Sequence, residues 1–115
     1  MKGKTMDFHA HVYYDWGHRD EALQLHAELE AICPQGMTIY PLVDRLVGPH
    51  LLPMFEIDFA GRLYDALTGW LEQHHGNLPV LIHPLTPDEI ANHGELARWI
   101  GEEQPINWAR LGVAA

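Results

Sequence analysis

Residues 7 to 15 read Asp7-Phe8-His9-Ala10-His11-Val12-Tyr13-Tyr14-Asp15. Successive side chains of a β-strand point to opposite faces, so residues two apart share a face. One face of this predicted strand is apolar and suits a core, and it carries Phe8, Ala10, Val12 and Tyr14. The other face carries His9, His11 and Tyr13. Its two imidazoles lie roughly 7 Å apart, which suits two ligands of one cation, although a half-exposed strand with polar outer rings is the alternative.

Length and composition predict one folded domain over residues 1–115. The chain has 115 residues, of which 47% are apolar and 20% charged, as in ordinary soluble domains. Its apolar runs are much shorter than the ~20 residues that span a bilayer, and no apolar run follows Lys2 and Lys4 as in a secretory leader. The single cysteine, Cys33, excludes an internal disulfide and fits a reducing cytoplasm.

The charge and the histidine content restrict the class of partner. A formal charge of −9 argues against binding to nucleic acid or to an anionic membrane. Nine histidines in so short a chain are unusual, and histidine is the commonest metal ligand in proteins. The composition therefore favours a small-molecule or metal site.

Apolar periodicity and turn signals predict the remaining elements. Phe55, Ile57 and Phe59 alternate with polar residues at the period of a strand. Thr86 and Pro87 have the residue types of a helix start. Strands are expected at residues 7–15, 37–42, 52–59 and 78–84, and helices at residues 18–32, 62–75 and 86–101.

This order predicts an α+β, ferredoxin-like (βαββαβ) fold with a four-stranded antiparallel sheet, both main helices on one face, and an extra C-terminal helix. Strand 7–15 should lie between strands 52–59 and 78–84. We expect strand 52–59 to be its parallel neighbour and strand 78–84 its antiparallel neighbour. The second face of the sheet then needs a cover, either a partner subunit, the C-terminal helix or a ligand.

Polar residues from separate parts of the chain should converge on that second face. His83 is expected beside His9, because antiparallel pairing brings the end of strand 78–84 to the start of strand 7–15. Glu56 comes from the other neighbouring strand. His50, just before that strand, should enter the site from the end at which His9 and His83 lie. Asp58 is interpreted as a solvated strand residue.

Such a set of ligands favours a redox metal. Two histidines and one carboxylate, with open positions for substrate and O₂, are typical of non-haem Fe(II) oxygenases. The absence of any Cys-x-x-Cys pair argues against structural zinc and against an iron–sulfur cluster. Hydrolysis at zinc, with three ligands and a water, is the alternative that these residue types leave open.

Several segments of the chain resemble one family in the same order. These segments are His9-Ala10-His11-Val12-Tyr13-Tyr14-Asp15, Val47-Gly48-Pro49-His50 with Met54-Phe55-Glu56-Ile57, Val80-Leu81-Ile82-His83-Pro84-Leu85-Thr86 with His93, and Ala97-Arg98-Trp99-Ile100-Gly101. Together they resemble the DOPA 4,5-dioxygenase family of aromatic ring-opening enzymes from about residue 7 to residue 101. One departure is Leu51-Leu52-Pro53, where the family more often has proline directly after the histidine.

The resemblance implies a ferredoxin-like subunit, often dimeric, that opens the ring of a DOPA-like catechol by extradiol cleavage with O₂. It also implies Fe(II), with Zn(II) as a substitute. We assign the metal to His9, His11, His83 and Glu56. The acid–base candidates are His50 and His93, and His50 could exchange roles with His11.

Other functions remain open at this stage. The histidine-lined face could serve a non-enzymatic small-ligand binding module, or it could be the interface of a dimerising subunit. A monooxygenase without a cofactor is a further alternative. The preferred interpretation is a cytoplasmic homodimeric enzyme that acts on a catechol and binds neither nucleic acid nor membrane.

Overall fold

The structure is a computed structural model that describes residues 7–112. Lys2 and Lys4, around which no secretory leader is expected, lie outside the described residues. It is an α+β fold with one five-stranded antiparallel sheet, in the order β2-β3-β1-β4-β5. The strands are β1 (Asp7–Tyr13), β2 (Met37–Ile39), β3 (Met54–Ala60), β4 (Val80–Pro84) and β5 (Arg98–Ile100). The helices are α1 (Arg19–Ile32), α2 (Tyr64–His74) and α3 (Glu89–His93), and single 3-10 turns lie at Trp16–His18, Gly61–Leu63 and Trp108–Leu111.

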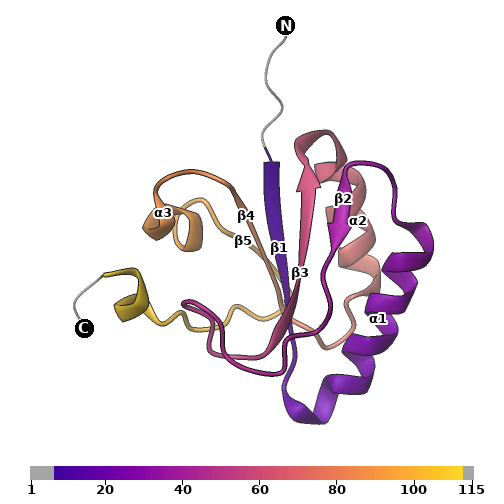
Figure 1. Ribbon diagram of the computed structural model, residues 1–115, viewed down its shortest axis with the longest axis horizontal. Helices are drawn as coiled ribbons and strands as arrows, with labels where there is room; N and C mark the ends of the chain where they lie inside the picture. The colour runs from indigo at the N-terminus through magenta and orange to yellow at the C-terminus, as the bar shows by residue number, and fades with distance from the viewer. Residues whose placement is uncertain (1–6, 113–115) are drawn as a thin grey trace, which may run out of the picture.

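The two long helices lie side by side against one face of the sheet, and α3 lies on the opposite side (Figure 1). The main core fills the space between the sheet and these helices. It contains Ala10 and Val12 of β1, Ile57 of β3, and Leu25 and Leu29 of α1. The alternation expected in β1 is therefore confirmed, because its apolar residues face α1 and α2 while His9 and His11 face away.

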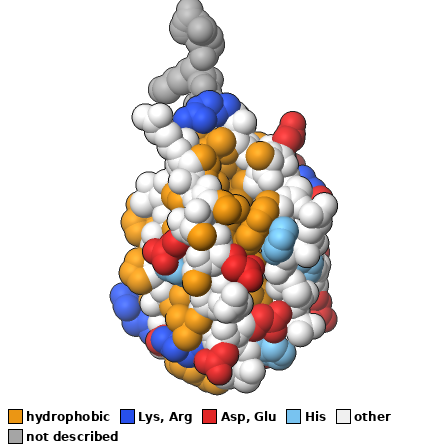
Figure 2. All heavy atoms as spheres, turned by 90° about the vertical axis from the view of Figure 1, so that its right-hand side faces the viewer, with side chains coloured by type: hydrophobic (Ala, Val, Ile, Leu, Met, Phe, Trp, Pro, Cys, Tyr) orange, Lys and Arg blue, Asp and Glu red, His pale blue; other side chains and the backbone are white. Residues whose placement is uncertain are grey.

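The outer side of the helical layer has an apolar strip flanked by acidic side chains (Figure 2). A shallow groove between α1 and α2 lies there, lined among others by Leu29, Ile32, Leu67 and Trp70. No helix of residues 7–112 is long and apolar enough to cross a membrane.

The central strand is antiparallel to both of its neighbours. His9 is opposite Asp58 of β3 and opposite His83 of β4, and His11 is opposite Glu56. The pairing of His9 with His83 was expected, but the parallel orientation predicted for β3 is wrong. The crossover through α1 makes β2 run in the same direction as β1, and β3 is antiparallel to β2. As a result the start of β3 lies at the Tyr13 end of β1, and the loop with His50 enters from that end, not from the His9 end.

The C-terminal part differs most from the sequence-based prediction. The predicted helix 86–101 is confined to Glu89–His93, and Arg98–Ile100 pairs with β4 as a fifth strand. The helix stops because Gly94 leaves the helical conformation, at φ −118° and ψ −103°. Trp99 and Ile100 then point to opposite faces, with Ile100 in the main core. Hence the four-stranded sheet and the extra C-terminal helix are not what the described residues form.

A second apolar cluster covers part of the other face. Tyr13, Met54 and Leu81 are buried there, and Trp99 and Ile106 pack against them. The loop before β3 is fastened to the C-terminal segment by a β-bridge between residues 50 and 106 and by a hydrogen bond of 2.8 Å from the residue 107 amide to the residue 49 carbonyl. These contacts hold the segment that carries His50 over the sheet.

The start of α3 allows a first test. Asp88, not Thr86, is the N-cap, and its carboxylate accepts a hydrogen bond of 3.0 Å from the Ala91 amide. We expect Asp88→Ala to lower the free energy of unfolding by about 1 kcal/mol, the usual effect of removing such a cap. Urea unfolding followed by circular dichroism measures this change. Asp20→Ala is the control, because that carboxylate is exposed in the first turn of α1 without being its N-cap; equal destabilisation by both would contradict the assigned cap.

Candidate metal and catalytic site

Five imidazoles meet on the face of the sheet that is turned away from α1 and α2. They come from β1 (His9 and His11), the loop before β3 (His50), β4 (His83) and α3 (His93). The ring centroid of His11 lies 4.3 Å from that of His50 and 5.1 Å from that of His83. The centroids of His83 and His93 are 4.8 Å apart. The structure thus brings together every histidine that was predicted for the site.

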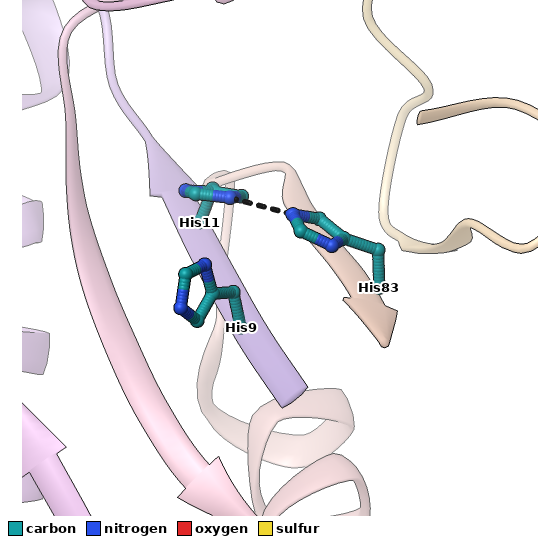
Figure 3. Close-up of side chains that lie close together, drawn as sticks. All are labelled: His9, His11 and His83. Atoms are coloured by element: carbon teal, nitrogen blue, oxygen red, sulfur yellow. Dashed lines mark hydrogen bonds between the residues drawn. The ribbon is translucent and has the colours of Figure 1, made fainter. Parts of the chain in front are cut away.

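These imidazoles form two overlapping groups of three. One is His9, His11 and His83, and the other is His11, His50 and His93, with the ligand atoms of each group within 4.8 Å of one another. His11 belongs to both. Figure 3 shows the first group, in which His11 and His83 point ring nitrogens toward each other and His9 lies beside them. His9 is the most accessible of the five, with 23% of its side chain exposed, and the other four are buried.

The hydrogen bonds of three buried imidazoles assign their tautomers. The Nδ1 atom of His83 donates to the Pro84 carbonyl at 2.9 Å, and that of His93 donates to the Glu89 carbonyl at 2.8 Å. A carbonyl oxygen only accepts, so each Nδ1 carries the proton. The Nε2 atom of each neutral ring is then left with its lone pair, the form in which imidazole binds a metal.

His11 is oriented in the same way by a sulfur atom. Its Nδ1 lies 3.2 Å from the Met54 thioether, which has no hydrogen to donate, so the ring nitrogen is the donor. The Nε2 atoms of His11 and His83 are 3.0 Å apart. Two lone pairs at this distance repel each other unless a cation or a proton lies between them. Two nitrogens, each ~2.1 Å from one ion, are separated by about 3 Å when they occupy adjacent positions, so the donors fit a metal.

Burial keeps these imidazoles neutral. It lowers the pKa of His11 well below its ordinary value, and the neighbouring histidines lower it further. Burial also lowers the pKa of His50 to about 4, with smaller contributions from His93 and His83. The pKa of His83 is lowered for the same principal reason. Since a histidine must be neutral to bind a metal, the site is ready for a cation at neutral pH.

Glu56 lies at the more accessible side of the cluster. One of its carboxylate oxygens is 3.5 Å from Nε2 of His9, and the other is 3.9 Å from Nδ1 of His11. Burial, together with the hydrogen bond and negative charge of Asp58, raises the pKa of Glu56 to about 8. The carboxyl group therefore keeps a proton near neutral pH, and a bound cation would favour its release.

Asp58 takes a larger part than the solvated residue that was predicted. Its Oδ1 atom is 3.0 Å from Nε2 of His9, yet it is buried and has no hydrogen-bond partner among the described residues. Its Oδ2 atom accepts a hydrogen bond of 3.1 Å from the Tyr40 hydroxyl. His9, Glu56 and Asp58 form a third group of donors within 4.8 Å of one another. The cross-strand register of His9 with Asp58 would have identified this contact, but the register was not known from sequence.

The hydrogen-bond partner of Tyr13 was also not predicted from the sequence. The hydroxyl of this side chain lies 2.6 Å from Nδ1 of His50. Burial raises the pKa of Tyr13, so the hydroxyl keeps its proton. The remaining histidines, at positions 18, 26, 74 and 75, take no part in the three donor groups.

Nearly the whole chain matches one protein family. The model of the Dopa 4,5-dioxygenase family matches residues 8–110. A DOPA 4,5-dioxygenase of Amanita muscaria is 27% identical over 120 residues, which cover 98% of this chain and 53% of that protein. An "Uncharacterized 21.2 kDa protein" of Botryotinia fuckeliana is 29% identical over 111 residues, which cover 87% of this chain and 60% of that protein. The chain spans little more than half the length of these curated relatives.

A solved structure extends the similarity to three dimensions. The crystal structure of a "putative dioxygenase" from Nostoc punctiforme matches with a TM-score of 0.85 at 29% identity, covering 96% of this chain and 97% of that one. The matched region of the family model includes all five clustered histidines and both carboxylates. On this evidence the chain belongs to the Dopa 4,5-dioxygenase family.

Proposed function

We propose that this chain catalyses the extradiol cleavage of a catechol by O₂, with Fe(II) held by His9, His11, His83 and Glu56. The observation that supports it most directly is the pair of Nε2 atoms of His11 and His83, 3.0 Å apart with both Nδ1 atoms already used as donors. Membership of a family named for this reaction supports the choice of a redox metal over a hydrolytic one.

The accessible side of the cluster determines where substrate would approach. His9, Glu56 and Asp58 have side chains that are 23%, 26% and 34% exposed, whereas the other four histidines are buried. A catechol would therefore reach the donors past these three side chains. Bound Fe(II) would supply a Lewis acid for the catechol oxygens and a path for electrons from the ring to O₂.

The chain itself would handle the protons of the catechol. The Nε2 lone pair of His93 can accept a proton from a hydroxyl group, because its Nδ1 is already held by the Glu89 carbonyl. His50 faces the same group of rings and is the second candidate for contact with the reacting oxygens. Positioned groups of this kind typically contribute ~10²- to 10⁴-fold to a rate.

The proposal extends to the architecture of the subunit. The order β2-β3-β1-β4, with α1 and α2 on one face, supports a ferredoxin-like unit to which β5 is added at the β4 edge. A homodimer, and a catechol with a DOPA-like side chain, are further parts of the proposal.

Oxygen uptake after metal exchange tests the reaction. The protein is stripped with a chelator, reloaded with Fe(II) or Zn(II), and mixed with catechol, DOPA or a monophenol that lacks the second ring hydroxyl. We expect O₂ uptake and a ring-opened product only with Fe(II) and only with the two catechols. Greater activity with Zn(II) would contradict the redox mechanism, and catechol binding without O₂ uptake would indicate a binding module instead.

A further inference from the structure

The contact between Tyr13 and His50 is the best-defined hydrogen bond of the site that the proposed function does not use. Both side chains are buried, at 1% and 5% exposure, and the hydroxyl lies 2.6 Å from Nδ1. The indole of Trp99 stacks on the phenol ring with centroids 5.9 Å apart, so the hydroxyl is held in place. Within residues 7–112 the hydroxyl makes no other hydrogen bond that meets ordinary geometric criteria.

The direction of this hydrogen bond follows from what each alternative leaves unpaired. If Nδ1 of His50 donated the proton, the buried O–H of Tyr13 would have no acceptor among the described residues. A buried donor without an acceptor loses the full free energy of its hydration. If Tyr13 donates instead, the hydroxyl and Nδ1 are both paired, and the remaining N–H of His50 lies among the lone pairs of the neighbouring His11 and His93, where a third lone pair would be repelled. The tyrosine is therefore the donor, and Nδ1 of His50 is the acceptor.

We propose that Tyr13 is a positioning residue that fixes His50 as the tautomer protonated on Nε2, so that His50 presents an N–H group to the cluster. This assignment is opposite to that of His11, His83 and His93, whose Nδ1 atoms donate and whose Nε2 atoms keep lone pairs. It rests on the proposed function only for the role of the N–H group in the reaction.

The tautomer separates His50 from the metal ligands. An Nε2 atom that carries a proton has no lone pair for a cation, and its Nδ1 lone pair is occupied by Tyr13. The group of His11, His50 and His93 is then not a second ligand set, although its ligand atoms lie within 4.8 Å of one another. The exchange of roles between His50 and His11, left open by the sequence, is resolved in favour of His11 as the ligand.

The same tautomer specifies what His50 does. A neutral imidazole is a poor proton donor but a good hydrogen-bond donor, and a preorganised N–H group stabilises negative charge on an oxygen. His50 would therefore stabilise the charged oxygen of the substrate without giving up its proton. His93, which has the free lone pair, is left as the group that moves the proton.

Nitrogen NMR of histidine tests the tautomer directly. The full-length chain, labelled with ¹⁵N-histidine, is measured without metal and with diamagnetic Zn(II), for the wild type and for Tyr13→Phe. We expect the wild-type His50 to show a protonated Nε2 and a bare Nδ1, and to keep this pattern on Zn(II) addition while His11 and His83 shift. In Tyr13→Phe the two His50 signals should move toward averaged values.

Tyr14→Phe is the matched control. Tyr14 is the next residue, packs in the main core on the other side of the sheet, and donates its hydroxyl hydrogen to Asp44. Removing that hydroxyl should leave the His50 signals unchanged. A wild-type His50 protonated on Nδ1, or a His50 spectrum that is the same in Tyr13→Phe, would overturn the proposal.

Metal binding and kinetics supply a second readout. We expect His50→Gln and Tyr13→Phe to bind Fe(II) within about twofold of the wild type, and kcat of Tyr13→Phe to fall about 10-fold or more with KM little changed. Loss of stoichiometric Fe(II) from His50→Gln would overturn the assignment. If the wild type takes up no O₂ with any catechol, the proposed function fails, and the NMR result alone then decides the role of Tyr13.

Discussion

His11→Phe is expected to abolish stoichiometric metal binding, with Fe(II) or Zn(II) affinity reduced by more than about 100-fold. His11 belongs to both groups of histidines, and its Nε2 is 3.0 Å from that of His83. Replacement of His11 removes one of the two imidazole donors whose Nε2 atoms are placed to share one ion. Phenylalanine keeps a planar ring but has no nitrogen. Calorimetric titration and metal content after gel filtration measure the loss.

The same variant should keep its fold. In the absence of a cation, His11 is a buried polar ring whose lone pair faces another lone pair, so an apolar ring relieves a repulsion. We expect the metal-free variant to unfold at a temperature equal to or above that of the metal-free wild type. His74→Phe is the control, because His74 is exposed on α2 and stacks on Trp70. Wild-type affinity in His11→Phe would show that the cluster does not hold the metal.

The stability of the metal-free protein is expected to fall steeply between pH 6.5 and pH 4. His50 has a pKa of about 4 in the folded state, compared with 6.5 as the ordinary value. The unfolded chain therefore binds a proton in this range that the folded chain does not, and stability decreases as pH falls. A shift of this size corresponds to about 3 kcal/mol for His50 alone. The lowered pKa values of His11 and His83 act in the same direction.

Glu56 makes the opposite contribution. Its pKa is raised from 4.5 to about 8, so the folded state holds a proton that the unfolded chain releases, and stability declines as pH rises through this range. Below pH 6.5 these three histidines outweigh the one carboxyl group, and above pH 6.5 the carboxyl group is the one of these four groups that still titrates. We expect maximal stability at about pH 6 to 7. Urea unfolding of the metal-free protein at half-unit steps of pH measures the profile; a flat curve from pH 7 to pH 4.5 would contradict the burial of neutral imidazoles.

Much of the sheet and of the site follows from alternation along single strands. In β1 the period of two separates His9 and His11 from Ala10 and Val12, and the structure has these pairs on opposite faces. The same period in β4 separates Leu81, in the second cluster, from Val80 and Ile82 of the main core, and it puts His83 on the face of Leu81. Such patterns are reliable because a strand that is buried on one face cannot shift by one residue without exposing its apolar side chains.

The errors concern relations between segments. The predicted helix 86–101 continued past Gly94, whereas α3 ends at His93 and Arg98–Ile100 pairs with β4 as a strand. The local sequence pattern does not indicate which strand an edge strand pairs with. For the same reason the contact of Tyr13 with His50 was not foreseen, because a loop brings the imidazole to the end of the strand from 37 positions away. The orientation of β3 likewise depends on the crossover through α1.

The separation of the two faces of the sheet has a consequence for protein engineering. The residues that hold the scaffold together point toward α1 and α2, while the donor atoms project from alternate positions of the same strands into the opposite layer. A combinatorial library that varies only the donor positions would leave the helix-facing packing untouched. New ligand sets, for other metals and other oxidations, can thus be introduced on a backbone that folds without their help.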